Sequence, residues 1–161
     1  MIGCIIAHKF AQSFKTPYLC AVQMSAVSAS ILPKHCIVIT GTSTYKDRGS
    51  KFLGFAELIL SEEEAKERIT WYKKKYHDAR HVCYAYRLGP DLWRTKDDGE
   101  PHGTAGLPIL RAIDALKRDC CLVVVVRYFG GTLLGTGGLM VAYREAAKSA
   151  LQKLEEETKK G

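Results

Sequence analysis

The residues best suited to chemistry lie in the segment 97–106, which reads DDGEPHGTAG. It combines three carboxylates, one histidine and three glycines directly ahead of a stretch with helical spacing. Glycine lets backbone amides approach a ligand or adopt positive φ, and amides at a helix start can hold an anion. Asp98 and Glu100 are therefore candidates for binding or acid–base roles; alternatively, they cap neighbouring elements and pin the loop.

A second glycine-rich segment, 127–138, reads RYFGGTLLGTGG and joins an apolar run to a helical pattern. A strand, a glycine turn and a helix in this order are typical of phosphate-binding loops. No Lys-Ser/Thr pair follows the glycines, and Met140 takes the third glycine position counted from Gly135, which excludes the P-loop and dinucleotide fingerprints. Our candidates for binding a ligand or RNA are Arg80, His81, Asp98, Glu100, Arg127, Tyr128, Gly130, Gly131, Gly135 and Gly137.

We assign no catalytic residue, no metal and no cofactor, and leave enzymatic activity open. His81 and Cys83 share one face of a predicted strand, but no third ligand is spaced to join them. The six cysteines lack the CxxC spacing of a zinc site and are predicted to be reduced thiols. At least one of Cys120 and Cys121 is expected to fill the core.

The elements that must position these residues follow from apolar periodicity. Strands are predicted at 36–40, 51–60, 81–88 and 122–126, the last a continuous apolar run typical of a buried central strand. Helices are predicted at 62–76, 107–117 and from 139 onward. Ser61 and Glu64 form a capping box at the start of the first helix.

Residues 1–35 are predicted to be an N-terminal extension and residues 36–161 the folded domain. The first 46 residues hold four lysines and no acidic residue, a composition that also resembles a mitochondrial targeting segment. The extension is therefore either poorly ordered or targeting-like. We expect a cytoplasmic location, with a mitochondrial one as the alternative.

The chain carries a formal net charge of +7, which favours partners with negative charge, such as RNA, ribosome surfaces or phosphorylated small molecules. No run of 18 apolar residues is present, so no membrane partner is expected. The oligomeric state is left open.

Three motifs together resemble the Impact N-terminal domain family, with the bacterial YigZ branch nearest. They are H81-x-C-x-A, the segment 98–108 (DGEPxGTAGxP) and the segment 125–139 (VxRYxGGxxLGxGGL) followed by Ala142 and Tyr143. The resemblance covers about residues 45 to 150, which is the core domain only. It implies an α+β fold like the second domain of small-subunit ribosomal protein five, with two layers and a four-stranded sheet packed on helices.

The resemblance also implies a function, because eukaryotic relatives regulate translation initiation. We expect a regulator of translation or an RNA- or ribosome-associated binding module, with a contact face that includes Arg80, His81, Arg127 and Tyr128. The alternative is a binder of small, phosphate-bearing ligands or an enzyme that uses Asp98, Glu100 and His81. A third hypothesis is that both glycine segments are purely architectural.

Overall fold

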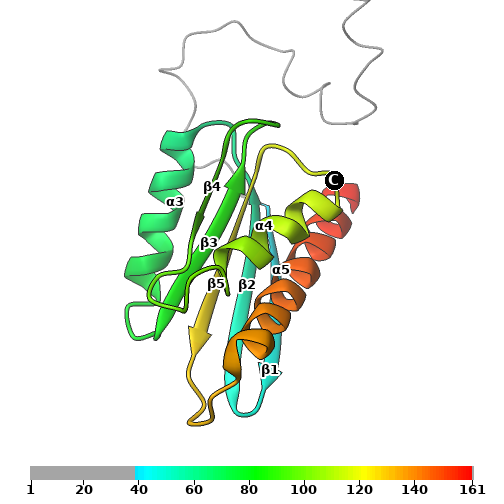
Figure 1. Cartoon of the computed structure of the whole chain (residues 1–161). Coiled ribbons are helices and arrows are strands. Elements are labelled where there is room, and N and C mark those ends of the chain that lie inside the picture. Colours follow the sequence, from blue (N-terminus) through cyan, green and yellow to red (C-terminus); the bar gives the residue numbers. More distant parts are fainter. Residues whose placement is uncertain (1–38, 161) are drawn as a thin grey trace, which may run out of the picture. The chain divides into compact units, whose positions relative to one another are not determined.

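The computed structural model describes residues 39–160 (Figure 1). Their first half contains two strands, a helix and a second pair of strands; a helix, a strand and a long helix follow. The elements are β1 (Thr40–Asp47), β2 (Ser50–Leu58), α3 (Glu62–Lys75), β3 (His81–Arg87), β4 (Trp93–Lys96), α4 (Gly106–Ala115), β5 (Cys121–Tyr128) and α5 (Gly135–Lys160).

All five strands form one sheet in the order β1-β2-β5-β3-β4, and every neighbouring pair is antiparallel. The β1–β2 hairpin turns at Arg48 and Gly49, whose φ angles of 44° and 81° are both positive. A two-residue turn with two positive φ angles matches the twist of the strands that it joins. β5 lies between β2 and β3, so the last strand in sequence becomes the centre of the sheet.

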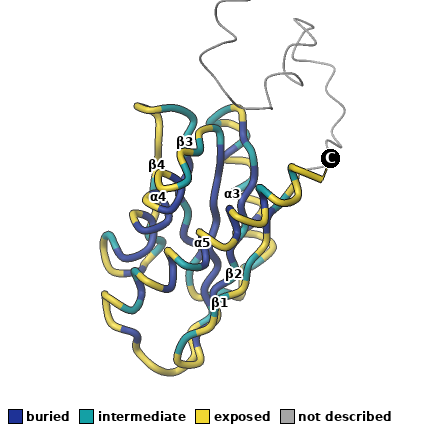
Figure 2. Tube along the Cα trace, turned by 90° about the vertical axis from the view of Figure 1, so that its right-hand side faces the viewer, coloured by how far each residue is buried: buried dark blue, intermediate teal, exposed yellow. Residues whose placement is uncertain are grey.

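Helices cover both faces of the sheet: α3 packs on one face and α4 and α5 pack on the other (Figure 1). Side chains of β5 alternate between the two layers. Val123 and Val125 join the cluster under α4 and α5, whereas Leu122, Val124 and Val126 join the cluster under α3. The predicted buried central strand is thus confirmed, and its apolar run follows from burial on both faces. Figure 2 shows the buried segments in dark blue through the middle of the described residues.

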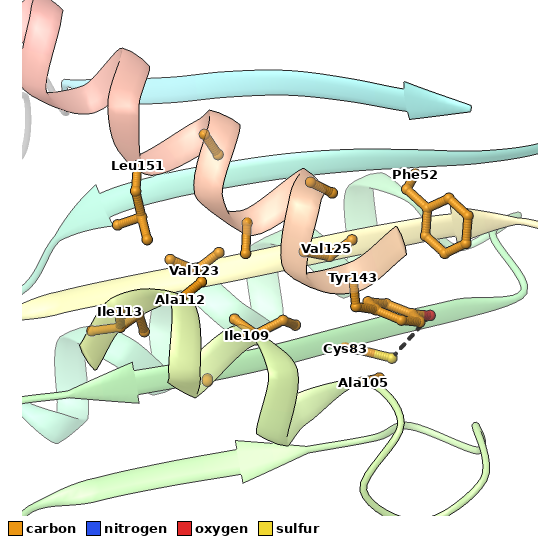
Figure 3. Packing of buried hydrophobic residues seen from close by; sticks show 14 of the residues in the cluster. Phe52, Cys83, Ala105, Ile109, Ala112, Ile113, Val123, Val125, Tyr143 and Leu151 are labelled. Atoms are coloured by element: carbon orange, nitrogen blue, oxygen red, sulfur yellow. Dashed lines mark hydrogen bonds between the residues drawn. The ribbon is translucent and has the colours of Figure 1, made fainter. Parts of the chain in front are cut away.

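The larger core cluster lies between the sheet and helices α4 and α5 (Figure 3). Ile109 and Ile113 of α4 pack there beside Leu151 of α5. Helix α5 approaches β2 closely because Gly54 has no side chain: an added Cβ would lie 2.6 Å from the carbonyl oxygen of Ala146. This close approach fixes the long helix against the sheet.

The predicted Ser61–Glu64 cap at the start of α3 is confirmed, with the difference that the Glu64 carboxylate bonds the N–H one residue before the N-cap Ser61. The Glu64 N–H donates to the Ser61 hydroxyl at 3.1 Å, and the Glu64 carboxylate accepts from the Leu60 N–H at 2.8 Å. The buried side chains of Ala65, Ile69 and Tyr72 form the stripe that the spacing predicts.

The α+β class is confirmed, but the expected four strands and two layers are wrong in detail. The additional strand is β4, a short and mostly exposed edge strand whose sequence WRTK carries no apolar alternation. The second helical layer is α3, which packs on the face opposite to α4 and α5. Periodicity identifies an apolar stripe on a helix, but does not tell which face of a sheet the stripe will cover.

Two element boundaries also differ from prediction. The first strand lies at Thr40–Asp47, so only Thr40 of the predicted 36–40 strand belongs to it, while residues 36–38 lie outside the described part of the chain. β1 is an edge strand with a mainly polar sequence, so a pattern of apolar residues does not identify it. Helix α5 begins at Gly135 rather than at 139, because its first turn is built from the glycine segment itself.

The extension 1–35 and the boundary at residue 36 lie outside the described residues, so the domain division stays a prediction. Among residues 39–160, no helix combines the length and the apolar composition needed to cross a membrane.

Candidate functional site

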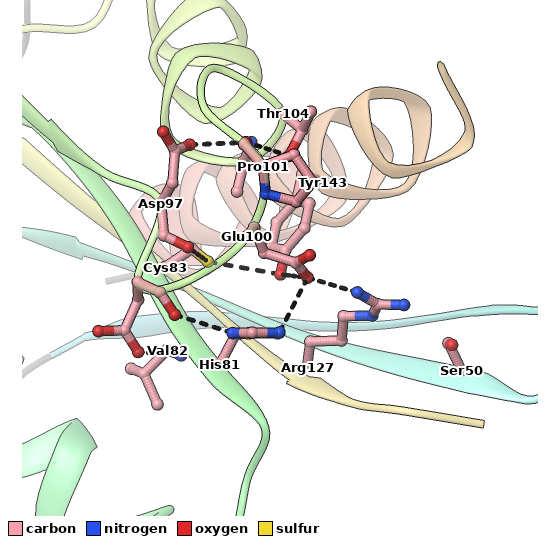
Figure 4. Close-up of polar contacts among 12 residues, drawn as sticks. Ser50, His81, Val82, Cys83, Asp97, Glu100, Pro101, Thr104, Arg127 and Tyr143 are labelled. Atoms are coloured by element: carbon pink, nitrogen blue, oxygen red, sulfur yellow. Dashed lines mark hydrogen bonds and ion pairs between the residues drawn. The ribbon is translucent and has the colours of Figure 1, made fainter. Parts of the chain in front are cut away.

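The two glycine segments meet at one end of the sheet, where Glu100 of the β4–α4 loop pairs with Arg127 of β5 (Figure 4). The Arg127 Nη1 donates to Glu100 Oε1 at 2.5 Å. Their side chains are only 6% and 3% exposed. A buried ion pair of this kind leaves an uncompensated charge if either partner is removed, so it holds the loop against the central strand.

Two further side chains surround the Glu100 carboxylate. The Tyr143 hydroxyl of α5 donates to Oε1 at 2.8 Å, and His81 Nε2 lies 3.8 Å from the same oxygen. His81 faces Arg127 directly in the β3–β5 register, so both side chains stand on one face of the sheet. Burial and the neighbouring carboxylate raise the pKa of Tyr143 far above its usual range, which keeps its hydroxyl protonated as a donor.

The orientation of His81 is set by the backbone. Its Nδ1 lies 2.8 Å from the carbonyl oxygen of Asp98, which can only accept a hydrogen bond. Nδ1 therefore carries a proton, and Nε2 is the nitrogen turned toward Glu100. Figure 4 shows the imidazole of His81 with one ring nitrogen turned toward the Glu100 carboxylate.

Asp97 organises the loop that carries Glu100. Its carboxylate accepts from the N–H groups of Gly103 at 2.9 Å, Ala105 at 3.1 Å and Gly106 at 2.8 Å. It thereby caps α4, whose N-cap residue Ala105 supplies no side-chain acceptor. Burial alone would raise the pKa of Asp97, but the three backbone donors outweigh it and the pKa lies below its usual value.

Asp98 also has a supporting position. Its carboxylate accepts from the Val82 N–H at 2.9 Å and from Lys73 Nζ at 3.1 Å, which ties the loop to β3 and α3. Burial opposes its ionisation, yet these two donors hold the pKa of Asp98 below its usual value. The carboxylate is committed to these partners, and Asp98 does not line the cavity described next.

A cavity of about 330 Å³ opens beside the Glu100–Arg127 pair. Charged groups line one part of it and apolar side chains the rest. Two apolar residues at its rim are unusually exposed, Leu133 by 80% and Phe129 by 47%. The lining consists of Arg80, His81, Glu100, Pro101, Arg127, Phe129, Leu133, Leu134, Gly135, Thr136 and Leu139.

The two arginines of the cavity differ in how many of their side-chain groups already contact other residues. The Arg127 guanidinium lies near two rings, 5.5 Å from the centre of Phe52 and 5.6 Å from that of Phe129. Its Nε finds no hydrogen-bond acceptor among residues 39–160. Arg80 is exposed, and its side chain forms no ion pair within the described part of the chain.

The structure thus brings together Arg80, His81, Glu100, Arg127 and Gly135 of the predicted candidates. Tyr128 lies on the opposite face of the sheet, where its hydroxyl donates to Asp78 at 3.0 Å. Successive residues of a strand point to opposite faces, so Arg127 and Tyr128 do not share a surface.

The remaining predicted glycines do not line the cavity. Gly130 packs against the β1–β2 turn, where an added Cβ would overlap the backbone of Gly49 and Ser50. Gly131, with a φ of 86°, and Gly137 both face open space and do not line the cavity.

Sequence reasoning missed Asp97, Tyr143 and the apolar rim. Tyr143 fits the apolar stripe of α5, and nothing in its spacing shows that its hydroxyl meets Glu100. Phe129 and Leu133 could have been found from the sequence. Two large apolar side chains inside a glycine-rich loop indicate that the loop contacts a ligand, a partner or another part of the protein.

The described cysteines and acidic residues form neither a metal site nor a reactive thiol. No group of three or more His, Cys, Asp and Glu side chains within residues 39–160 is arranged to hold a metal ion. Cys83 is buried and donates to the Asp97 carbonyl at 2.9 Å, and burial raises the pKa of its thiol well above the usual range. Burial also raises the pKa of Cys121 to about 12, and its buried position confirms that at least one of Cys120 and Cys121 fills the core.

Comparison with known proteins finds one family and a consistent set of relatives. The model described as "Impact N-terminal domain" matches residues 48–151. An IMPACT family member of Thermus thermophilus is 48% identical over 104 residues, which are 65% of this chain and 56% of that protein. The IMPACT family member YigZ of Escherichia coli is 43% identical over 109 residues, which are 65% of this chain and 53% of that protein.

A solved structure is similar to this chain. It is described as that of the two-domain translational regulator Yih1, with 28% identity and a TM-score of 0.50 over 83% of this chain and 53% of that one. The chain spans about half the length of the curated relatives that it matches.

Proposed function

The chain belongs to the Impact N-terminal domain family, and we propose that it regulates translation as an RNA- or ribosome-associated binding module. The cavity beside the Glu100–Arg127 pair is the contact site of this module. Support from relatives comes from Yih1, whose structure is described as that of a translational regulator. We assign the module to the cytoplasm, with the mitochondrion as the alternative.

The observation that carries this proposal is that exposed side chains border the cavity. Arg80 is exposed without an ion pair among the described residues, and the exposed Phe129 ring lies at the same rim. Arginine neutralises phosphates, and an exposed aromatic ring stacks on bases. The net charge of +7 favours the approach of an anionic partner.

The alternative function, a small-ligand binder or an enzyme, is supported by one specific arrangement. The Asp98 carbonyl holds His81 with Nε2 directed to the carboxylate of Glu100 inside the cavity. A histidine and a carboxylate at a cavity wall are suited to general acid–base chemistry. Asp98 would contribute only through its backbone, since its carboxylate is engaged by Val82 and Lys73.

Fluorescence anisotropy with labelled single-stranded RNA tests the proposal. Arg80→Gln should weaken binding and lower the slope of log affinity against log salt by about 0.7, the loss of one phosphate contact. Arg111→Gln is the matched control, because Arg111 is an exposed arginine on α4 and does not line the cavity. Its affinity should equal that of the unchanged protein.

A second variant tests whether another face binds instead. Lys74 lies beside the exposed Trp71 on α3, a basic and aromatic surface on the other side of the sheet. If Lys74→Gln weakens RNA binding while Arg80→Gln does not, the cavity is not the contact site. No measurable RNA or ribosome binding at low salt would reject the proposed function itself.

A further inference from the structure

We propose that the cavity binds the terminal phosphate of a nucleotide, held at the N-terminus of α5 between Arg80 and Arg127. This inference rests on the proposed function, because it names the chemical group that the same cavity recognises. The phosphate would come from a free nucleoside monophosphate or from the 5′ end of an RNA chain.

The first observation is the start of α5 in the cavity wall. Gly135 and Thr136 open this helix and line the cavity, and the first turn contains no acidic side chain. The first N–H groups of a helix have no intrahelical acceptor, and the aligned peptide dipoles favour negative charge at this end. A Cβ added to Gly135 would meet no atom within 4 Å, so a ligand can approach the backbone there.

The second, independent observation is Arg127. This side chain lines the cavity, is more than nine-tenths buried, and keeps an Nε–H without an acceptor among residues 39–160. Buried N–H groups are nearly always hydrogen-bonded in folded proteins, so this unpaired Nε–H would gain an acceptor from a ligand. The Nε atom itself is enclosed in this structure, so the guanidinium has to turn toward the cavity to make that contact.

The charges of the side chains that line the cavity also favour an anionic ligand. Arg80 and Arg127 contribute two positive charges to the lining and Glu100 contributes one negative charge, which leaves an excess of one before His81 is counted. Arg127 is already paired with Glu100, so Arg80 and the helix start supply the positive potential that remains available. An anionic ligand would offset this excess.

The rest of the lining selects a nucleotide over a bare anion. Phe129 offers an exposed ring for stacking, and Leu133, Leu134 and Leu139 provide apolar surface. A volume of about 330 Å³ lies at the small end of ligand pockets, which span about 300–1,000 Å³. The cavity therefore has room for one nucleotide unit. A free nucleotide, or the terminal nucleotide of an RNA chain, is small enough to enter it.

Isothermal titration calorimetry with adenosine 5′-monophosphate, adenosine and inorganic phosphate tests the first source. Two short single-stranded RNAs of the same sequence, one with a 5′-phosphate and one with a 5′-hydroxyl, test the second. We expect the phosphorylated member of at least one pair to bind at least about tenfold more tightly. Arg80→Gln should remove most of this preference, and Arg111→Gln should leave it unchanged.

A site-specific measurement locates the ligand. In ¹⁵N-resolved NMR spectra, the amide signals of Gly135 and Thr136 should shift when the phosphorylated ligand is added, and not with adenosine. Shifts confined to the α3 surface around Trp71 would overturn the inference, whatever the affinity.

The outcomes separate the inference from the proposed function. RNA that binds equally well with and without a 5′-phosphate, together with no binding of the monophosphate, rejects the inference and leaves the proposed function standing. Binding of the monophosphate without binding of RNA or ribosomes supports the inference and rejects the proposed function. A peptide carboxylate that binds in the cavity when both phosphorylated ligands fail would also overturn the inference.

Discussion

The Nη1 of Arg127 donates to the Glu100 carboxylate at 2.5 Å, and this contact joins the two glycine segments of the sequence. Both side chains are buried, and both line the cavity. The pair therefore has two roles, since it stabilises the β4–α4 loop and shapes the candidate site. A variant of either residue changes both, so stability must be measured before any loss of binding is interpreted.

Glu100→Gln should lower the free energy of unfolding by about 3 kcal/mol, because it leaves the Arg127 guanidinium buried without a compensating charge. Urea denaturation followed by circular dichroism measures this change. Glu156→Gln is the control, since Glu156 is exposed near the end of α5, and its effect should stay within about 0.5 kcal/mol. Equal effects of the two substitutions would contradict the importance of the buried pair.

Tyr143→Phe should cost about 1–2 kcal/mol, because Glu100 loses the hydroxyl that donates to it at 2.8 Å. Combined with Glu100→Gln, the two changes should be non-additive, since the residues are in direct contact. Tyr128→Phe provides the control, because its hydroxyl bonds the Asp78 carboxylate at an exposed position. Strict additivity in the double-mutant cycle would show that the two groups are not coupled.

Asp97→Asn should lower the free energy of unfolding by about 1–2 kcal/mol, since the carboxylate caps α4 through three backbone donors. The effect should depend on pH. The folded pKa of Asp97 lies below the usual 3.8, so its stabilisation is present above that pH and is lost as the pH falls through the folded value. Urea midpoints measured across the acid range should fall less steeply for Asp97→Asn than for the unchanged protein. Parallel curves would contradict this role of Asp97.

Two glycines of the second segment should respond in opposite ways to alanine. Gly130→Ala should destabilise by more than about 3 kcal/mol, because the new Cβ would overlap the backbone of Gly49 and Ser50. Gly137→Ala should be neutral or stabilise by up to about 1 kcal/mol, because the position is helical and the added methyl meets open space. Thermal melts of the two variants check this contrast, and similar melting temperatures would show that the turn contact at Gly130 is unimportant.

Several elements were predictable from sequence because the interactions that determine them are local. The capping box at Ser61 and Glu64 operates within one helical turn, and the apolar run of β5 records burial on both faces. The strand β4 was not predictable, since an exposed edge strand forms only because the neighbouring strand β3 offers hydrogen-bonding partners.

From the sequence came the family resemblance, the α+β class that this resemblance implies, and the two segments that hold Glu100 and Arg127, because the motifs depend on residue type, spacing and order. The contact between these two residues, the hydrogen bond from Tyr143 and the opposite orientation of Tyr128 follow from the folded arrangement. The reason is that β5 pairs with both β2 and β3 across long separations in sequence. Such pairings are set by the packing of the whole domain, and the cavity beside Arg127 exists only once they have formed.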